Sequence, residues 1–576
     1  MKELNDMSTT ENEKGRVTGA EALLMSLLAE GVKTLFGYPG GAIIPVYDHL
    51  YGYTDRLHHI LTRHEQGAVH AAQGFARATG QVGVCLATSG PGATNLVTGI
   101  ADAMIDSTPL VCITAQVAAS ALGSDAFQEA DIISMTMPVT KWNFQITRAE
   151  EIPGAIAKAF YIARSGRPGP VVIDFTKNAQ TEMLDFHYTP CTSLRSYQPV
   201  PPLPTTAIAQ AIEMINAAEK PLLLIGQGVL LSNAENDAIA LAEQGGIPMA
   251  TSLLGISAVP TNHPLYVGNI GMHGNLAPNE MTQQSDLIIS VGMRFSDRVT
   301  GDVKSYAPHA KVIHIDIDAA VLNKCIPAAL PILADAKQAL QAILPGIKHK
   351  ERPEWLTFAA QKRNEEHESV VKTAMHPAGG GITMCQAVQA LADAEHGDAI
   401  IVTDVGQNQM FGARYSRFNT TRSFITSGGL GTMGFGLPAA VGAKLGRPDR
   451  EVVAILGDGG IQMTIQELGT IKQEHLGVKI VVLNNSYLGM VRQWQQLFYE
   501  QRYSFTAMDN PDFTMIAAAY GIPAARVSQP EELPAAMQKL AEADGPYFLE
   551  VVVRPEDNVF PMVPAGASLS NVMCKE

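Results

Sequence analysis

Cysteine is scarce in this sequence and is never paired at short spacing. The 576-residue chain contains 6 cysteines, which are scattered along its length without a Cys-x-x-Cys motif. Disulfide scaffolds and structural zinc sites both need clustered cysteines. The sequence therefore excludes these two classes and favours reduced thiols, as in intracellular proteins.

Charged residues and long apolar runs are also few. Asp, Glu, Lys and Arg make up 17% of the chain and leave a net charge of −15, whereas soluble proteins average roughly 25% charged residues. We therefore expect part of the surface to lie in subunit interfaces. The negative charge disfavours nucleic acid and anionic membrane surfaces as partners.

Neither a membrane span nor a secretion signal is indicated. No apolar run approaches the roughly 20 residues that a membrane span needs. The polar segment 1–16 lacks the apolar core of a signal peptide. These absences predict a cytoplasmic protein with no membrane and no nucleic-acid partner.

Short apolar runs alternate with helical patterns throughout the chain, which is typical of parallel sheets covered by helices. The length fits three such α/β domains, each a doubly wound parallel sheet. Prolines between 190 and 204 indicate a stiff linker, and the charged stretch after residue 345 indicates an irregular one. The predicted segments are an arm (1–16), a first domain (17–186), a linker (187–206), a middle domain (207–345), a second linker (346–381) and a third domain (382–576).

Two neighbouring strands of the third domain are predicted to end in metal-binding residue types. The apolar run Val452–Leu456 is followed by Gly457-Asp458-Gly459, and the run Val478–Leu483 is followed by Asn484-Asn485. The stretch between them, Ile461–Glu474, is long enough for the crossover helix of a βαβ unit. Both motifs then lie at the carboxyl edge of the sheet, where open α/β sheets bind ligands.

Asp458 and Asn485 offer hard oxygen ligands that are too few to enclose a metal alone. Mg²⁺ accepts such a set because phosphate oxygens and water complete its octahedron. A lone Gly-Asp-Gly is common turn chemistry, but the paired strands and the 27-residue spacing make the pattern similar to the thiamine-diphosphate (ThDP) signature. The stretch therefore predicts a Mg²⁺–diphosphate anchor.

Glu65 is the candidate acid–base residue. It follows the apolar run His59–Leu61 and opens an alanine-rich helical stretch. An isolated Glu there is explained by the helix macrodipole alone. Beside a ThDP anchor it gains a second meaning, because this cofactor needs a carboxylate on its aminopyrimidine ring, held dry and within hydrogen-bond reach.

Three further loops combine glycine with strand ends. Ser89–Asn95 could bind an anion, but we interpret it as a tight turn that packs the first domain. Ser427–Gly436 has five glycines, which favours a wall against the cofactor with Met433 as an apolar support. Gly406–Gln409 follows a strand and would offer amides to a diphosphate.

With these motifs the chain resembles the catalytic large subunit of acetohydroxyacid synthase, also called acetolactate synthase, from about residue 17 to 566. The resemblance rests on GYPGGAI (37–43), RHEQGA (63–68), SGPGATN (89–95), SDAFQEAD (124–131), SGRPGPVVIDFTK (165–177), GMHG (271–274), GMRFSDRVTG (292–301), TDVGQNQMF (403–411), GGLGTMGFGLPAA (428–440), GDGGIQMTIQEL (457–468), NNSYLGMVRQWQ (484–495) and MVPAGA (562–567). It implies the ThDP-binding fold, in which two ThDP-type domains flank a middle domain associated with FAD.

The resemblance also implies site residues. Glu65 would activate ThDP, and Mg²⁺ would be bound by Asp458, Asn485 and the Tyr487 carbonyl. The implied ThDP contacts are Glu65, Gly406, Gln407, Asn408, Gly431, Met433, Gly457, Asp458, Gly459, Gly460, Asn485, Tyr487, Leu488, Gly489 and Met490. The implied residues around the reacting carbon are Gly41, Phe127, Gln128 and Lys177, with the second ketoacid held by Arg298 and enclosed by Met272, Met490 and Trp494.

The flavin contacts depend mainly on the resemblance, since the Gly226-Gln227-Gly228 turn is not a dinucleotide fingerprint and an acid at a strand end only suggests a ribose contact. They are Arg167, Gly226, Gln227, Gly228, Asn275, Gly292, Arg294, Asp297, Arg298, Asp316, Asp318 and Asp335. On their own, Trp494 is equally explained as a core anchor and Met272 as core filler. Two positions depart from the family: Asn408 replaces a usual His and Ser296 a usual Asp.

The family implies decarboxylation of pyruvate and transfer of the two-carbon unit to pyruvate, giving 2-acetolactate, or to 2-ketobutyrate, giving 2-aceto-2-hydroxybutyrate. It further implies at least a homodimer, or a dimer of dimers, and a separate small regulatory subunit. The alternatives are a flavin-free catabolic synthase, pyruvate oxidase, glyoxylate carboligase and an inactive ThDP-binding scaffold. The first would lack RFSDRVTG and GMHG, and glyoxylate carboligase lacks the activating Glu.

Overall fold

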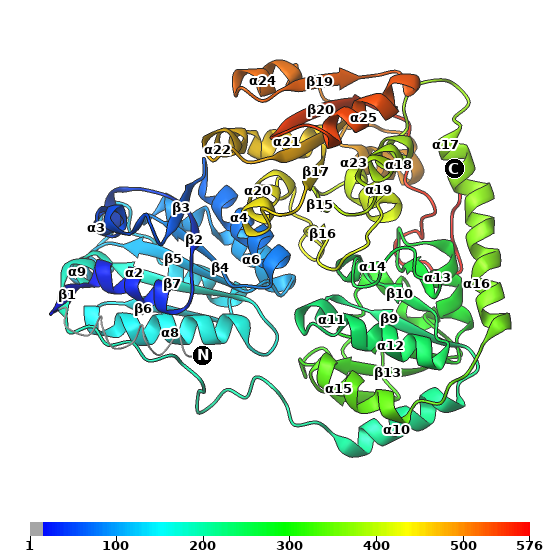
Figure 1. The fold of residues 1–576 in the computed structure, drawn as a ribbon, viewed down its shortest axis with the longest axis horizontal. Coiled ribbons are helices and arrows are strands. Elements are labelled where there is room, and N and C mark those ends of the chain that lie inside the picture. Colours follow the sequence, from blue (N-terminus) through cyan, green and yellow to red (C-terminus); the bar gives the residue numbers. More distant parts are fainter. Residues whose placement is uncertain (1–14, 576) are drawn as a thin grey trace. The chain divides into compact units, whose positions relative to one another are not determined.

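The computed structural model describes residues 15–575, so the predicted arm 1–16 lies outside the described part except for its last two residues. Three six-stranded sheets dominate this part of the chain, and every strand pairing within them is parallel (Figure 1). Such sheets need helices on both faces, and their strands are almost entirely buried. The predicted α/β fold class is confirmed.

The first sheet is built from residues 34–176. Its strands are β2 (Thr34–Tyr38), β3 (His58–Leu61), β4 (Gly83–Ala87), β5 (Leu110–Gln116), β6 (Trp142–Ile146) and β7 (Pro170–Thr176). The helices around it are α2 (Gly19–Ala29), α3 (Ile44–Leu50), α4 (Glu65–Thr79), α5 (Pro91–Thr94), α6 (Val97–Ile105), α7 (Ile132–Thr136), α8 (Ile152–Arg164) and α9 (Lys177–Thr181). A two-stranded antiparallel ribbon joins β1 (Val17–Thr18) to β8 (Met183–Leu184). The central strands β5 and β7 are buried at every residue, which explains their unbroken apolar runs.

The middle sheet is built from residues 221–333. Its strands are β9 (Pro221–Ile225), β10 (Met249–Thr251), β11 (Tyr266–Asn269), β12 (Leu287–Val291), β13 (Lys311–Asp316) and β14 (Leu330–Leu333). Its helices are α10 (Thr205–Ala217), α11 (Gln227–Leu231), α12 (Glu235–Gly245), α13 (Leu276–Gln284), α14 (Asp297–Thr300) and α15 (Ala336–Ile343).

The third sheet is built from residues 400–552. Its strands are β15 (Ile400–Thr403), β16 (Phe424–Ile425), β17 (Val452–Gly457), β18 (Val478–Asn484), β19 (Ala524–Val527) and β20 (Tyr547–Val552). Its helices are α18 (Met384–Glu395), α19 (Gln407–Tyr415), α20 (Gly436–Gly446), α21 (Asp458–Thr464), α22 (Leu468–Gln473), α23 (Gly489–Phe498), α24 (Phe513–Ala519) and α25 (Leu533–Ala541).

The first and third sheets share one topology. Their spatial orders are β3-β2-β4-β5-β7-β6 and β16-β15-β17-β18-β20-β19, and numbering the strands of each sheet along the chain gives 2-1-3-4-6-5 in both cases. The middle sheet, β11-β10-β9-β12-β13-β14, gives 3-2-1-4-5-6, the order of dinucleotide-binding domains. Ligands bind such sheets at the point where the strand order reverses. This point lies between β2 and β4 in the first sheet, between β9 and β12 in the middle sheet, and between β15 and β17 in the third.

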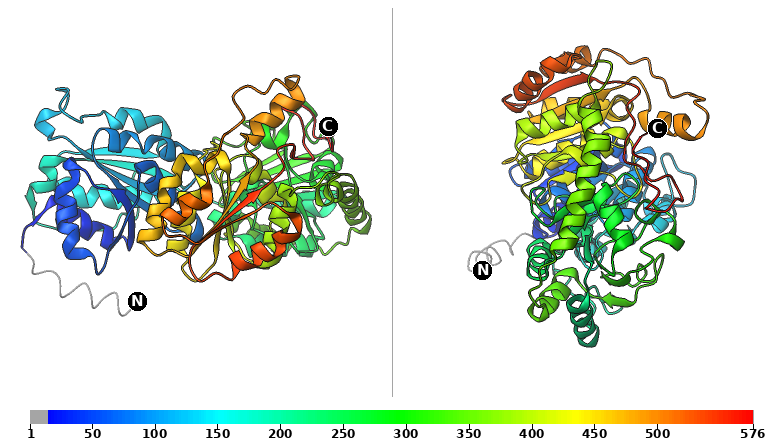
Figure 2. Two further views of the ribbon diagram at one scale, coloured as in Figure 1. Left: turned by 90° about the horizontal axis from the view of Figure 1, so that it is seen from above. Right: turned by 90° about the vertical axis from the view of Figure 1, so that its right-hand side faces the viewer.

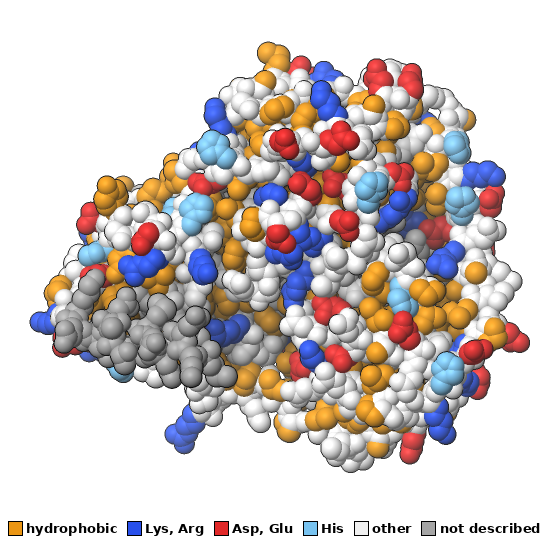
Figure 3. Space-filling view, in the orientation of Figure 1, with side chains coloured by type: hydrophobic (Ala, Val, Ile, Leu, Met, Phe, Trp, Pro, Cys, Tyr) orange, Lys and Arg blue, Asp and Glu red, His pale blue; other side chains and the backbone are white. Residues whose placement is uncertain are grey.

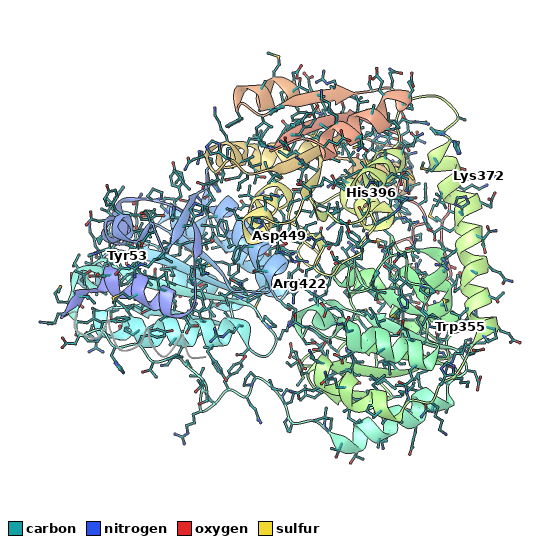
Figure 4. The ribbon with its side chains drawn as sticks, in the orientation of Figure 1. Tyr53, Trp355, Lys372, His396, Arg422 and Asp449 are labelled. Carbon is teal, nitrogen blue, oxygen red and sulfur yellow. The ribbon has the colours of Figure 1, made fainter. Side chains whose placement is uncertain are left out.

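Two local predictions are wrong. The segment 346–381 is not irregular: it contains α16 (Pro353–Glu366), a π-helical turn (His367–Val371) and α17 (Lys372–Met375). Figure 4 marks the two ends of this helical segment with Trp355 and Lys372, and in Figure 2 it runs beside the middle sheet. Only three side chains of α16 are buried, so its apolar periodicity is too weak to predict a helix.

The crossover predicted at Ile461–Glu474 begins earlier and is broken. Helix α21 starts at Asp458 itself, and a 3₁₀ turn at Ile465–Glu467 separates it from α22. Asp458 therefore lies in the first turn of a helix, where the positive end of the macrodipole stabilises a carboxylate.

Candidate functional site

The carboxyl edge of the third sheet brings the predicted metal ligands together. Strand β17 ends at Gly457 and β18 at Asn484, and the two strands pair directly with Gly457 opposite Leu483. Asp458 and Asn485 are the next residues of these two neighbouring strands. The predicted βαβ juxtaposition of one carboxylate and one carboxamide is confirmed.

Asp458 is buried and held by a residue that the sequence did not point to. Its Oδ2 accepts a hydrogen bond of 2.7 Å from Asn510 Nδ2, which also donates to Asn484 Oδ1 at 3.0 Å. Gln462 Nε2 donates to Asn510 Oδ1 at 2.9 Å and so fixes the orientation of the carboxamide. Burial raises the pKa of Asp458 to about 6, and the bond from Asn510 opposes this shift.

Asn485 forms a tight turn that reaches Tyr487. Its Oδ1 accepts from the Tyr487 backbone N–H at 3.2 Å, and its Nδ2 donates to Gln407 Oε1 at 3.3 Å. Residues 15–575 contain no cluster of three His, Cys, Asp or Glu side chains able to hold a metal ion. One carboxylate, one carboxamide and a backbone carbonyl fit Mg²⁺ when a diphosphate supplies the remaining oxygens.

Asp404 organises the glycine-rich loops and was also missed from sequence. This buried residue follows β15, and its carboxylate accepts from the backbone N–H groups of Val405, Gly434 and Gly436 at 2.8–3.1 Å. A Cβ on Gly460 would lie 2.4 Å from its Oδ1. One side chain thus ties together the three glycine-containing segments that begin after β15, β16 and β17.

The side-chain amides of the Gly406–Gln409 motif do not point to a ligand. Gln407 Nε2 donates to Gln493 Oε1 and Asp557 O, and Gln409 Nε2 donates to Thr426 Oγ1 and Ser427 O. Asn408 Nδ2 donates to the carbonyls of Asp404 and Ile455, at 3.0 Å each. The donors that this segment offers are the backbone N–H groups of the first turn of α19.

Glu65 begins α4 at the carboxyl edge of the first sheet, and its side chain is buried. Its Oε2 accepts a 2.9 Å hydrogen bond from Asn95 Nδ2, and a Cβ on Gly92 would lie 3.2 Å from Oε1. The Ser89–Asn95 loop does make the predicted tight turn, with φ +59° at Gly90. It is more than a packing element, because it also holds the Glu65 carboxylate.

The other residues predicted around the reacting carbon lie at the same edge. Gly41 follows β2 and is exposed, Lys177 follows β7 and is exposed, and Phe127 and Gln128 lie in the loop after β5. Phe127 is 88% exposed. Gln128 has φ +60°, a conformation that is rare for a residue with a side chain and is typical of functional loops.

Met272 and Arg298, which are both predicted for the acceptor pocket, are in contact. The Met272 N–H donates to Arg298 O at 2.7 Å, and Arg298 Nη1 lies 3.7 Å from Met272 Sδ. The Arg298 side chain is 63% exposed, with Asp297 at 3.9 Å. Met490 and Trp494 lie four residues apart on α23 and therefore on one face of it, where Trp494 contacts the Phe498 ring at a centroid distance of 5.1 Å.

The predicted flavin-binding glycines are required by the protein itself. Gly226 and Gly228 lie against the backbone of Gly292, where a Cβ would come within 2.1 Å and 2.6 Å of backbone atoms, and Gly292 has φ +59°. This contact joins the loops after β9 and β12, the point at which the strand order of the middle sheet reverses.

The predicted flavin-binding polar residues have local partners. Asp335 caps α15 through Gln338 N–H, and Asp316 accepts from Asp318 N–H at 2.9 Å. Asn275 donates to Glu366, and Arg167, in the first domain, donates to Ser107 Oγ at 2.8 Å. The remaining members, Gln227, Arg294, Asp297 and Asp318, lie in the loops or first turns after β9, β12 and β13.

Comparison with known proteins first gives the class. Three family models match the chain in order: the N-terminal TPP binding domain of thiamine pyrophosphate enzymes at residues 17–135, their central domain at 208–343 and their C-terminal TPP binding domain at 404–551. The fold and both ThDP-type sheet edges therefore define a thiamine pyrophosphate enzyme.

Whole-chain relatives narrow the class. The chain is 46% identical over 574 residues to the acetolactate synthase large subunit of Corynebacterium glutamicum, covering 97% of this chain and 90% of that protein. It is 45% identical to the acetolactate synthase isozyme 2 large subunit of Escherichia coli K12, covering 97% and 100%, and 43% identical to the chloroplastic acetolactate synthase 1 of Nicotiana tabacum, covering 96% and 84%. The chain belongs to the acetolactate synthase large-subunit family, as its motifs predicted.

Two further observations concern the surface. No helix within residues 15–575 has the length and apolarity to span a membrane. On the face drawn in Figure 3, acidic and basic side chains are interspersed.

Proposed function

We propose that this chain is the catalytic subunit of an acetolactate synthase that depends on ThDP, Mg²⁺ and FAD. It decarboxylates pyruvate and joins the two-carbon unit to a second 2-ketoacid. Pyruvate as acceptor gives 2-acetolactate and 2-ketobutyrate gives 2-aceto-2-hydroxybutyrate, the first common step of branched-chain amino-acid synthesis. The observation that carries the proposal is the pairing of Asp458 and Asn485 on neighbouring strands of a chain related along nearly its whole length to these synthases.

The metal and diphosphate would be held at the edge of the third sheet. Asp458, Asn485 and the Tyr487 carbonyl would supply oxygen ligands for Mg²⁺, and the backbone amides at the start of α19 would bind the diphosphate. The open space over Gly431, whose Cβ would meet only Val405 Cγ1 at 3.9 Å, provides room beside them. When bound, ThDP supplies the electron sink for decarboxylation and carbon–carbon bond formation.

Glu65 is the proposed acid–base residue toward the cofactor ring. Its carboxylate is buried and its orientation is fixed by Asn95, so the proton it carries or releases is held at a defined position. Gly41, Phe127, Gln128 and Lys177 lie at the same edge and would surround the reacting carbon. Excluding water from this position favours carbon–carbon bond formation over protonation by solvent.

Arg298 would hold the carboxylate of the acceptor ketoacid. A guanidinium presents two parallel N–H groups to a carboxylate, and the Arg298 side chain is mostly exposed and available for this contact. Met272 lies against it and would form the apolar wall of the pocket, with Met490 and Trp494 from α23.

FAD is proposed for the middle domain. Its support is the 3-2-1-4-5-6 strand order, which places the Gly226–Gly228 and Gly292 loops at the reversal point where dinucleotides bind. The close contact of these glycines is explained by packing alone, so they do not distinguish a flavin site from a tight turn.

We also propose an assembly and a location for this chain. The relatives are named as large subunits, which supports a separate small regulatory subunit for this chain. A homodimer or a dimer of dimers would bring the first and third domains of different chains together. The cytoplasm remains the predicted location.

Product analysis tests the proposal. The purified chain is incubated with ThDP, Mg²⁺ and FAD, with pyruvate alone or with 2-ketobutyrate, and with or without an electron acceptor. Acetolactate and aceto-hydroxybutyrate are expected, and Glu65→Gln should reduce their formation by orders of magnitude. Formation of acetate or acetyl phosphate would identify a pyruvate oxidase, and bound ThDP without any product would identify an inactive scaffold.

A further inference from the structure

A buried ion pair joins α16, which follows the middle domain, to α19 of the third domain. The first turn of α19 is the proposed diphosphate site. Glu366 is the last residue of α16, and Arg414 is in the last turn of α19. Arg414 Nη2 and Glu366 Oε1 are 2.5 Å apart, and the two side chains are 1% and 7% exposed. Burying both charges costs desolvation energy that an exposed pair avoids, so the pair is not explained by stability alone.

The place of Glu366 in its helix makes the pair more unusual. At Glu366, α16 passes directly into the π-helical turn His367–Val371, and π-helical turns inside helices are frequent at functional sites. Both carboxylate oxygens of Glu366 accept hydrogen bonds from a segment of the middle domain. Oε1 accepts from Asn275 Nδ2 at 2.8 Å, and Oε2 accepts from the Leu276 backbone N–H at 2.5 Å, at the start of α13.

Arg414 binds the same segment from its other side. Its Nη1 donates to the carbonyls of Gly274 at 2.8 Å and His273 at 3.3 Å. Burial, followed by the positive charges of Arg414 and Arg298, lowers the pKa of His273 to about 3, so both guanidinium groups face this loop. The contacts of the pair described here therefore fall on four consecutive residues, 273–276.

These four residues immediately follow Met272, which is fixed from the opposite side. The Met272 N–H donates to Arg298 O, and its carbonyl accepts from Val563 N–H at 2.8 Å. Asn279 bonds both backbone groups of Gly271, at 2.9 Å each. The loop is thus held at residues 271–272 by these contacts and at residues 273–276 by the ion pair.

Arg414 also lies at a fixed distance from the proposed diphosphate site, because both are on α19. It lies on the same nine-residue helix as Gln407 and Asn408, about 9 Å along the axis from Asn408 at 1.5 Å per residue. We infer that Glu366 and Arg414 are positioning residues. They hold the loop 271–276, which contains Met272, at a set distance from α19 and thereby determine which 2-ketoacid is accepted. This inference rests on the proposed function, because it assigns Met272 and Arg298 to the acceptor pocket.

Three variants test the inference. Glu366→Gln keeps the side-chain shape but turns an N–H₂ group toward groups that are themselves donors. Arg414→Lys keeps the charge but loses the planar fork that reaches the pair and both carbonyls. Arg422→Gln is the matched control, since Arg422 joins β16 to the middle domain through Leu230 O and Asn233 Oδ1 without touching the loop (Figure 4).

The first readout is the ratio of the two products in mixtures of pyruvate and 2-ketobutyrate. Glu366→Gln should shift the ratio at least threefold and raise the acceptor KM at least fivefold, with the ThDP dissociation constant within twofold of wild type. Arg414→Lys should shift the ratio in the same direction by less, and Arg422→Gln should leave it unchanged. An unshifted ratio in folded Glu366→Gln, or an equal shift in Arg422→Gln, overturns the inference.

The second readout is hydrogen exchange of residues 271–276 in protein without ThDP or substrate, which does not depend on turnover. Glu366→Gln should exchange at least tenfold faster there, and Arg422→Gln should not. If Glu366→Gln does not fold, Asn275→Ala removes one hydrogen bond to Glu366, together with the bond that Asn275 Oδ1 accepts from Asn269 N–H, and must still speed exchange. Unchanged exchange overturns the inference. A wild-type chain that makes no acetolactate overturns the proposed function and the inference together. Acetolactate formation with a product ratio unaffected by Met272→Ala overturns only the inference.

Discussion

Asn95→Ala should slow catalysis although the sequence motif that contains Asn95 predicts only a tight turn. Its Nδ2 donates a single 2.9 Å hydrogen bond to the buried Glu65 carboxylate. Hydrogen bonds to charged groups contribute about 1.5–3 kcal/mol. If that energy is lost in the transition state, the rate falls about 10- to 150-fold, since each 1.36 kcal/mol is a factor of ten.

The assay is the initial rate of acetolactate formation at saturating ThDP and Mg²⁺. Thr94→Ala is the control, because Thr94 Oγ1 bonds only to Pro91 O within its own turn and should cost less than twofold. Asn95→Asp should be slower than Asn95→Ala, because it places a second carboxylate beside Glu65.

A double-mutant cycle separates positioning from general disruption. If Asn95 acts through Glu65, adding Asn95→Ala to Glu65→Gln should change the residual rate by less than threefold. Additive losses, or an Asn95→Ala rate within twofold of wild type, would refute the argument that this hydrogen bond orients the catalytic carboxylate.

Three other outcomes follow from the same contacts. Asn510→Ala removes the donor to Asp458 and should weaken Mg²⁺-dependent ThDP binding about 10- to 100-fold, measured by fluorescence titration with Mg²⁺. Gly226→Ala places a Cβ 2.1 Å from Gly292 O and should destabilise the chain by about 1–3 kcal/mol even without FAD, measured by thermal unfolding; an effect seen only with FAD would contradict the packing argument. Burial lowers the pKa of His70 to about 3, whereas the unfolded chain takes up this proton near the ordinary value of about 6.5. Stability is therefore complete above pH 6.5 and falls by up to about 1.4 kcal/mol per unit as the pH drops toward 3, so the urea midpoint should fall more steeply between pH 7 and pH 5 in wild type than in His70→Gln.

The buried strands could be predicted from sequence nearly to the residue. The runs Val452–Leu456 and Val478–Leu483 correspond to β17 and β18, because strands of a parallel sheet are apolar on both faces and their ends are marked by glycine or asparagine. Helix α16 could not be predicted in this way. Most of its surface is solvated, and its one buried charge, Glu366, looks in the sequence like another surface acid.

The site was predicted only in its chemically distinctive part. Asp458 and Asn485 are marked by strand ends that follow one another along the chain. The residues that hold the site side chains in place are not marked in this way. Asn510, which bonds to Asp458, is 52 residues away from it, and Asn95 is 30 residues away from Glu65. Asparagine carries no signal of its role until its partner is known, and the partner is determined by which strands become neighbours.

The departure at position 408 has a local explanation. Both N–H groups of the Asn408 carboxamide are directed at backbone carbonyls, those of Asp404 and Ile455. These carbonyls belong to neighbouring strand ends, so Asn408 stabilises the junction of β15 and β17. Its Oδ1 is then turned toward Gly406 and Gly457, where it can accept but not donate a hydrogen bond.

The role of a glycine is difficult to predict from sequence. A missing side chain signals close approach of backbone, but it does not say whether protein or ligand approaches. Gly226 and Gly436 have backbone atoms within 2.7 Å of where a Cβ would lie, so the protein itself demands glycine there. Gly41 has no described atom within 4 Å of that point and no positive φ, so nothing in this part of the chain requires it to be glycine. Exposed glycines such as Gly52 and Gly154 have equally empty surroundings, so the place of Gly41 beside the reacting carbon stays a prediction.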